Sequence, residues 1–157
     1  MDGIYRGIFV LLSCLLLQGC TLKAEKLDLI GTWKNKDGAV IILNEDGMFS
    51  AKEINYFKVY NEPEFKNKKI DFSGKWKSTT TGNQKRAAID LTSNSTYKDF
   101  GIAKKNYIDR NVKEQSMEIG MTLQIAGSGL FENKKPYYLF VNVGDPDDMN
   151  KYKFIKQ

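Results

Sequence analysis

The residues of this chain that could do chemistry are few, and Cys20 is the most informative of them. The chain contains two cysteines and no histidine. Without histidine it lacks the commonest general base, the usual serine and cysteine triads and most zinc sites. Cys14 lies within an apolar run, and Cys20 ends that run in the sequence Leu17-Gln18-Gly19-Cys20. We therefore expect no enzymatic activity and no metal site, and the thiol of Cys20 is the group to explain.

The apolar run before Cys20 is typical of an export signal. Residues 8–17 form a core of about ten apolar residues preceded by Arg6, too short to span a bilayer. The end of the run, Leu17 to Cys20, resembles the lipobox of bacterial lipoproteins. That resemblance implies a diacylglycerol on the Cys20 thiol, cleavage just before this residue and an acyl chain on the new amino terminus. No other cofactor is expected. An ordinary signal peptide with a chance cysteine is the alternative.

The predicted organisation is a lipoprotein signal peptide over residues 1–19, a lipidated cysteine and polar tether over 20–28, and one domain over 29–157. Without the signal, about 140 residues remain, which suits a single domain. Cys14 leaves with the signal, so no disulfide is expected. The lipid would anchor the protein to a membrane of the cell envelope. In the lipoprotein family Thr21 after the cysteine implies the outer membrane if the host has two membranes.

The positive charge of the chain limits the chemical classes of partner that it can attract. The formal net charge is +5, with lysines grouped at 66–69, 104–105 and 134–135. Such a charge favours anionic lipid headgroups, surface polysaccharide or an acidic protein. Nucleic acid is not an expected partner of an exported, lipid-tethered protein.

The folded part reads as β-structure throughout. Alternation is most regular over residues 116–126, where Met117, Ile119, Met121 and Leu123 share one face. Further strands are predicted at 39–43, 52–60, 70–77, 86–92, 100–107, 137–143 and 151–156. With short turns between them, about eight strands predict an all-β, antiparallel up-and-down barrel. The four residues of that face either line an adaptable apolar cavity or simply fill the interior.

A short motif occurs twice in the predicted strands. Gly31-x-Trp33-Lys34 recurs as Gly74-x-Trp76-Lys77. In each copy the glycine and the tryptophan are two residues apart, so they lie on the same face of the strand. Gly31-Thr32-Trp33 after an exported leader resembles the opening motif of the calycin superfamily, which comprises the lipocalins and avidins. The resemblance implies an up-and-down barrel whose cup holds a small apolar ligand.

The resemblance to avidins extends to Asn35, which would hydrogen-bond biotin together with a serine four residues later. That position is Ala39, which has no hydroxyl to donate. Biotin binding is therefore not expected, and Asn35 is interpreted as a turn residue.

The densest oxygen cluster is Asp145, Asp147, Asp148 and Asn150, and hard cations bind such ligands. Met149 stands where a calcium loop needs an oxygen ligand, so a plain acidic turn is the preferred interpretation.

Taken together, these observations predict a lipid-anchored, non-enzymatic envelope protein that binds a small apolar ligand or an envelope component in a lipocalin-like manner. The alternative is a protein-interaction module, such as an inhibitor, immunity or exclusion lipoprotein, with an acidic protein as partner. A hydrolase that uses carboxylates alone is a third possibility.

Overall fold

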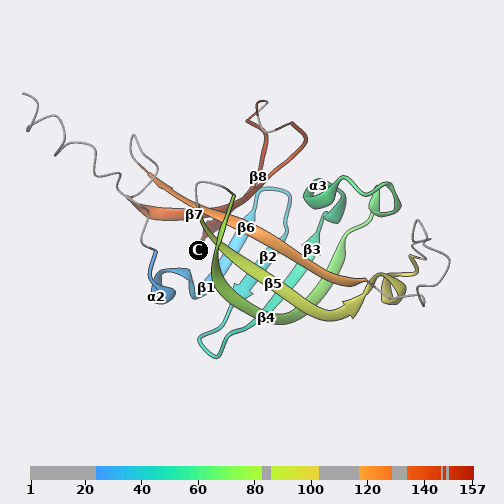
Figure 1. Ribbon diagram of the computed structural model, residues 1–157, viewed down its shortest axis with the longest axis horizontal. Coiled ribbons are helices and arrows are strands. Elements are labelled where there is room, and N and C mark those ends of the chain that lie inside the picture. Colours follow the sequence, from blue (N-terminus) through green and yellow to red (C-terminus); the bar gives the residue numbers. More distant parts are fainter. Residues whose placement is uncertain (1–23, 83–85, 103–116, 129–133, 146, 148) are drawn as a thin grey trace, which may run out of the picture.

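The chain folds into a closed barrel of eight antiparallel strands, joined in sequence order and sealed by the pairing of the last strand with the first (Figure 1). The computed structural model describes residues 24–82, 86–102, 117–128, 134–145, 147 and 149–157. The predicted all-β, up-and-down barrel is confirmed. The predicted signal peptide and Cys20 lie outside the described residues. In the described part of the chain, no helix is both long and apolar enough to cross a membrane.

Strands of very different length form the wall, with short helical segments at their ends. The strands are β1 (Gly31–Asn35), β2 (Val40–Leu43), β3 (Met48–Ile54), β4 (Ile70–Thr81), β5 (Arg86–Thr96), β6 (Glu118–Ser128), β7 (Lys134–Asn142) and β8 (Lys151–Lys156). The helical segments are α2 (Lys26–Leu29), α3 (Tyr56–Tyr60), η1 (Pro63–Phe65) and η2 (Tyr97–Phe100). Strand alternation sends every second side chain into one hydrophobic core.

Both tryptophans are buried and hold chain segments at the α2 end of the barrel. Trp33 is fully buried, and its Nε1 donates a hydrogen bond of 2.8 Å to the carbonyl of Leu29 at the end of α2. Trp76 donates from its Nε1 to the carbonyl of Asn44, also at 2.8 Å. Gly74 is buried two residues before Trp76, whereas Gly31 is partly exposed.

The opposite end of the barrel is closed by aromatic side chains from α3, η1 and η2. The rings of Tyr56 and Phe65 are 4.6 Å apart, and those of Phe65 and Tyr97 are 5.3 Å apart. The Tyr56 hydroxyl donates to the carbonyl of Gly120 in β6 at 2.7 Å. Burial raises the pKa of Tyr56, so this hydroxyl remains a donor at neutral pH. The barrel therefore has no open mouth at this end among the described residues.

The strand predicted over residues 52–60 is wrong in its second half, because residues 56–60 form α3. The Asn55 side chain accepts a hydrogen bond from the backbone N–H of Lys58, and Asn61 ends the helix in the left-handed conformation. These two caps stabilise a short helix in a segment whose alternation predicted a strand. The strand predicted over 100–107 falls mainly outside the described residues, and Phe100 belongs to η2.

Candidate functional site

The strongest functional feature of the barrel is an uneven distribution of charge around its wall. Four neighbouring strands, β7, β8, β1 and β2, contain six lysines and no aspartate or glutamate. We call these strands the basic half. Its lysines are Lys34, Lys134, Lys135, Lys151, Lys153 and Lys156. Carboxylates stand close to these strands along the chain: Asp28, Asp37 and Glu45 lie in the segments that border β1 and β2, and Glu132 and Asp145 flank β7 in the sequence.

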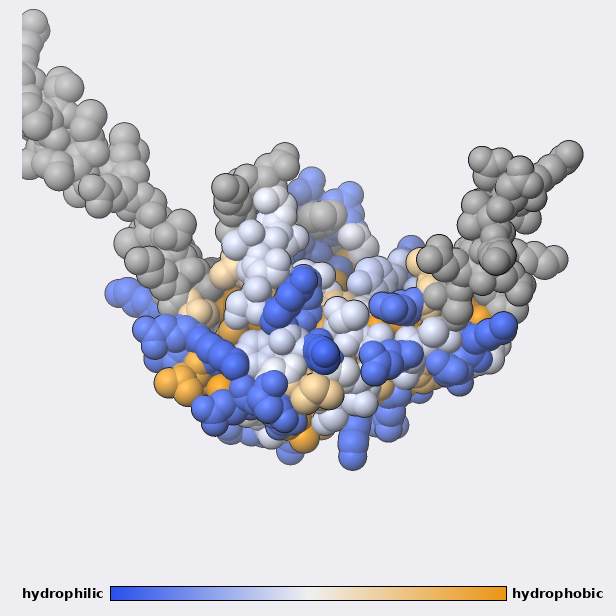
Figure 2. Space-filling model, turned by 60° about the horizontal axis from the view of Figure 1, so that its bottom comes forward, coloured by the Kyte–Doolittle hydropathy of each residue, from blue (hydrophilic) through white to orange (hydrophobic). Residues whose placement is uncertain are grey.

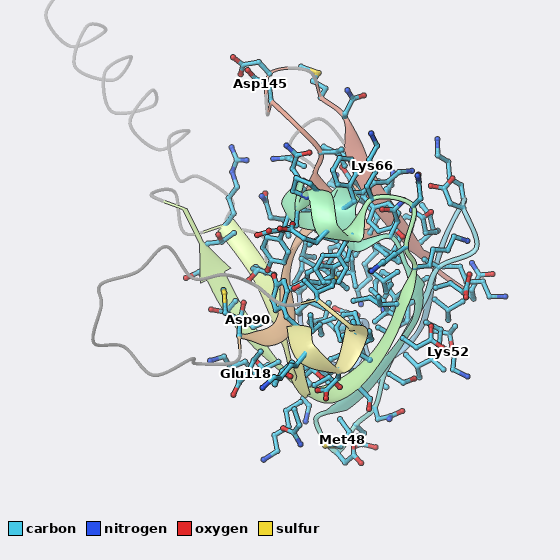
Figure 3. The ribbon with its side chains drawn as sticks, turned by 90° about the vertical axis from the view of Figure 1, so that its right-hand side faces the viewer. Met48, Lys52, Lys66, Asp90, Glu118 and Asp145 are labelled. Carbon is cyan, nitrogen blue, oxygen red and sulfur yellow. The ribbon has the colours of Figure 1, made fainter. Side chains whose placement is uncertain are left out.

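The other four strands, β3 to β6, form a neutral half. Their basic residues are Lys52, Lys75, Lys77 and Arg86, and their acidic residues are Glu53, Asp71, Asp90 and Glu118. Figure 3 shows Lys52 and Asp90 on opposite sides of the barrel, so these charges are spread over the surface. On the face drawn in Figure 2, hydrophilic residues dominate and hydrophobic residues form small separate patches. The net positive charge of the wall therefore lies in the basic half.

The outer face of β7 and β8 combines these lysines with aromatic rings. Tyr138 and Phe140 point outward from β7, with ring centroids 5.6 Å apart. The Lys153 ammonium lies 3.6 Å from the centroid of Tyr138, and the Lys151 ammonium lies 4.4 Å from that of Phe140. Cation–π attraction holds both ammonium groups against this sheet face. Phe140 is only 5% exposed although it lies outside the barrel.

A groove of about 420 Å³ adjoins the basic half at the α3 end. It is lined by Asn35, Lys36, Asp37, Lys58, Val143, Asn150, Lys151, Tyr152, Lys153 and Ile155. Its volume is that of a ligand-sized site, and its lining has four lysines and one carboxylate. The groove can therefore bind an anionic group next to an apolar one.

The polar groups of the groove are arranged for binding rather than for proton transfer. The Asp37 carboxylate accepts a hydrogen bond of 2.7 Å from Lys58, which lowers the pKa of Asp37 and makes it a weak base at neutral pH. Asn35 donates from its side chain to the Lys153 carbonyl and accepts from the Asp37 N–H, each at 2.7 Å. Asn35 thus ties the β1–β2 turn to β8.

Of the four predicted cavity residues, three lie in the interior and one does not. Ile119 and Leu123 are fully buried and Met121 is 2% exposed, and all three belong to the core. Met117 precedes β6 and is 44% exposed. It therefore does not share the buried environment of the other three, because it lies before the first residue of β6. A ligand cavity beside the other three stays a prediction.

The acidic segment after β7 forms an exposed turn. The Asp145 carboxylate accepts a hydrogen bond of 3.0 Å from the backbone N–H of Asp147. Figure 3 shows Asp145 projecting from the barrel on this connection. Asp148 lies outside the described residues. Among the residues that the structure describes, there is no cluster of three or more histidine, cysteine, aspartate or glutamate side chains that could hold a metal ion.

The segment nearest the expected anchor is fastened to the basic half. Lys135 of β7 forms an ion pair with Asp28, and Lys156 of β8 donates a hydrogen bond of 2.7 Å to the Asp28 carbonyl. These residues also line a hollow of about 240 Å³ together with Trp33 and Tyr137.

The ion pair between Asp28 and Lys135 predicts a pH-dependent part of the stability. The hydrogen bond from Lys135 lowers the pKa of Asp28. A carboxyl with a lowered folded-state pKa stabilises the fold above its unfolded pKa of about 3.9, and this contribution is lost as the pH falls through the folded-state pKa. We expect Asp28→Asn to flatten the fall in stability between about pH 5 and pH 2, measured by urea unfolding at each pH. Lys135→Gln should flatten it to a smaller extent, because the Glu25 backbone N–H still donates to the Asp28 carboxylate. Profiles parallel to wild type in both variants would refute this role.

Sequence reasoning missed most of the basic half. Of the three lysine groups it singled out, only Lys134 and Lys135 belong to these strands. The lysines at 66–69 flank η1, and those at 104–105 lie outside the described residues. The predicted barrel could have led to this site, because closure of an up-and-down barrel places the first two strands beside the last two. The lysines of these four strands could then have been considered together.

Comparison with family models, curated proteins and solved structures yields no match. The class of the protein therefore rests on its own fold and site. It is a closed eight-stranded antiparallel barrel, compatible with the calycin-like resemblance, with one basic and one neutral half.

Proposed function

We propose that this protein is a non-enzymatic, lipid-anchored binding protein of a bacterial envelope, and that its basic half binds an anionic component of that envelope. The observation that carries the proposal is the concentration of six lysines on four adjacent strands that contain no carboxylate of their own, although Lys135 is paired with Asp28 from α2. Such a surface attracts anions over a distance of about a Debye length, 8–10 Å at physiological salt. The anchor is Cys20, in the lipobox-like sequence Leu17 to Cys20, and the outer membrane is its place if the host has two membranes.

The position of the groove agrees with a binding role. α2, which follows the expected anchor, and α3, which borders the groove, lie at opposite ends of the barrel (Figure 1). A lipid at Cys20 would hold the α2 end close to the membrane, because residues 21–25 reach at most about 18 Å when extended. The groove therefore lies at the end of the barrel away from the expected anchor.

The test compares two variants that remove the same charge from different halves of the barrel. Lys34→Gln/Lys151→Gln/Lys153→Gln removes three of the six lysine charges of the basic half, whereas Lys52→Gln/Lys75→Gln/Lys77→Gln is the matched control in the neutral half. We expect the first variant to lose affinity for dextran sulfate by about tenfold or more at low salt, with a shallower salt dependence, because each lysine contributes attraction to an anionic surface. Isothermal titration at several salt concentrations measures this. Equal losses in the two variants would refute the proposal.

A second candidate is an acidic protein partner, as for an inhibitor, immunity or exclusion lipoprotein. The groove favours it, because Val143, Tyr152 and Ile155 lie beside its lysines and could accept an apolar residue next to an acidic one. Pull-down with the control and basic-half variants from the native envelope would show a stoichiometric acidic protein with the control only.

A further inference from the structure

We propose that the anionic component is the membrane itself, and that the outer face of the basic half lies on anionic lipid headgroups, so that the barrel rests on its side. This inference depends on the proposed function, since it names the partner of the same surface. Two features of the structure and the expected position of the anchor lead to it.

The first feature is the chemical character of the charge. The basic half carries its charge as lysines alone, distributed along strands from both ends of the chain. Lysine is a compact, strongly hydrated point charge, and clustered lysines near a membrane respond to the diffuse negative potential of anionic lipids. The neutral half would not share this attraction, so the barrel would approach the membrane with one side only.

The second feature is the row of side chains on the outer face. Val40, Lys34, Ile155 and Tyr138 are paired in register across β2, β1, β8 and β7. Ile155 is 48% exposed, although it is a large apolar residue at the centre of this row. The exposed Ile155 suits the zone below the headgroups, and the lysines beside it would keep their ammonium groups in the headgroup layer, where Lys153 covers the Tyr138 ring. This row therefore matches a lipid interface in both charge and polarity.

The third feature is the position of the expected anchor. α2 is tied to β7 through the ion pair between Asp28 and Lys135, and to β8 through the hydrogen bond from Lys156 to the Asp28 carbonyl. The lipid on Cys20 would thus enter the membrane on the side of the basic half. The short tether would keep this face close to the bilayer at all times. This proximity favours the membrane over a freely diffusing protein as the binding partner.

The test measures where the barrel touches the bilayer. The full, lipidated chain carrying Ile155→Cys is labelled with an environment-sensitive fluorophore and reconstituted into vesicles of phosphatidylcholine alone or mixed with phosphatidylglycerol. The matched control is Lys77→Cys on the outer face of the neutral half. We expect a blue shift and quenching by nitroxide lipids at position 155 in the mixed vesicles, and neither signal at position 77. Salt at about 1 M, where the Debye length is about 3 Å, should abolish the signal at 155.

The outcomes separate this inference from the function on which it rests. If position 155 stays in water in the mixed vesicles while Lys34→Gln/Lys151→Gln/Lys153→Gln still weakens dextran sulfate binding, the membrane inference is overturned and an acidic protein becomes the partner. If that triple variant binds dextran sulfate like its matched control, the proposed function itself fails. If both labels respond alike in both kinds of vesicle, the lipid alone causes the contact and the inference is also overturned.

Discussion

Replacement of Trp33 by alanine is expected to lower the free energy of unfolding by about 3–5 kcal/mol. The indole is fully buried in the core at the start of the barrel wall, and its Nε1 donates to the Leu29 carbonyl. Truncation would leave a cavity and also remove the partner of a buried carbonyl. Because Leu29 ends α2, the loss should also loosen the segment that follows the expected anchor.

Two further variants separate packing from hydrogen bonding at this site. Trp33→Phe keeps an aromatic ring but removes the donor, and we expect it to cost about 1–3 kcal/mol. Leu27→Ala changes an α2 residue that is 71% exposed, and should shift stability by less than about 0.5 kcal/mol. Urea unfolding followed by far-ultraviolet circular dichroism measures all three. A Trp33→Ala variant as stable as Leu27→Ala would contradict the structural role of Trp33.

Gly74→Ala is the second substitution with a large expected effect. A Cβ atom at this position would lie 2.1 Å from the Thr92 carbonyl oxygen and 2.8 Å from the Cα of Ser93, both backbone atoms of β5. Because no side-chain rotation can relieve this clash, β4 and β5 would have to separate where they pair. We expect a loss of about 3 kcal/mol or more, or failure to fold.

The control for Gly74 is its neighbour Ser73, whose side chain is exposed on the outer face of β4. Ser73→Ala should unfold at nearly the wild-type urea concentration. If Gly74→Ala did not fold, expression with a stabilising osmolyte and near-ultraviolet circular dichroism would report whether the tryptophans still sit in a packed core. A Gly74→Ala variant with wild-type stability would show that β4 and β5 do not approach each other this closely.

Most strands of the barrel could be predicted from the local alternation of apolar and polar residues. The alternation in β4 and β6 depends only on the two-residue period of a strand, so it could be read from residues such as Phe72, Trp76, Met121 and Leu123. The same reasoning failed over residues 56–60, because an Asn55 cap and a left-handed Asn61 favour a helix over a continued strand. Met117 continues the alternation of β6 in the sequence, but it lies before the first residue of the strand and is exposed.

The sequence by itself determined that this is an antiparallel β-barrel, because strand alternation and short turns are local properties of the chain. The sequence also contains the lipobox-like segment Leu17 to Cys20, and lipidation of Cys20 remains a prediction. Only the tertiary structure decided that lysines from both ends of the chain share one face. Closure pairs β1 with β8, and so brings Lys34 beside Ile155 across more than a hundred residues. A charged face is set by contacts distant in sequence, which no local pattern contains.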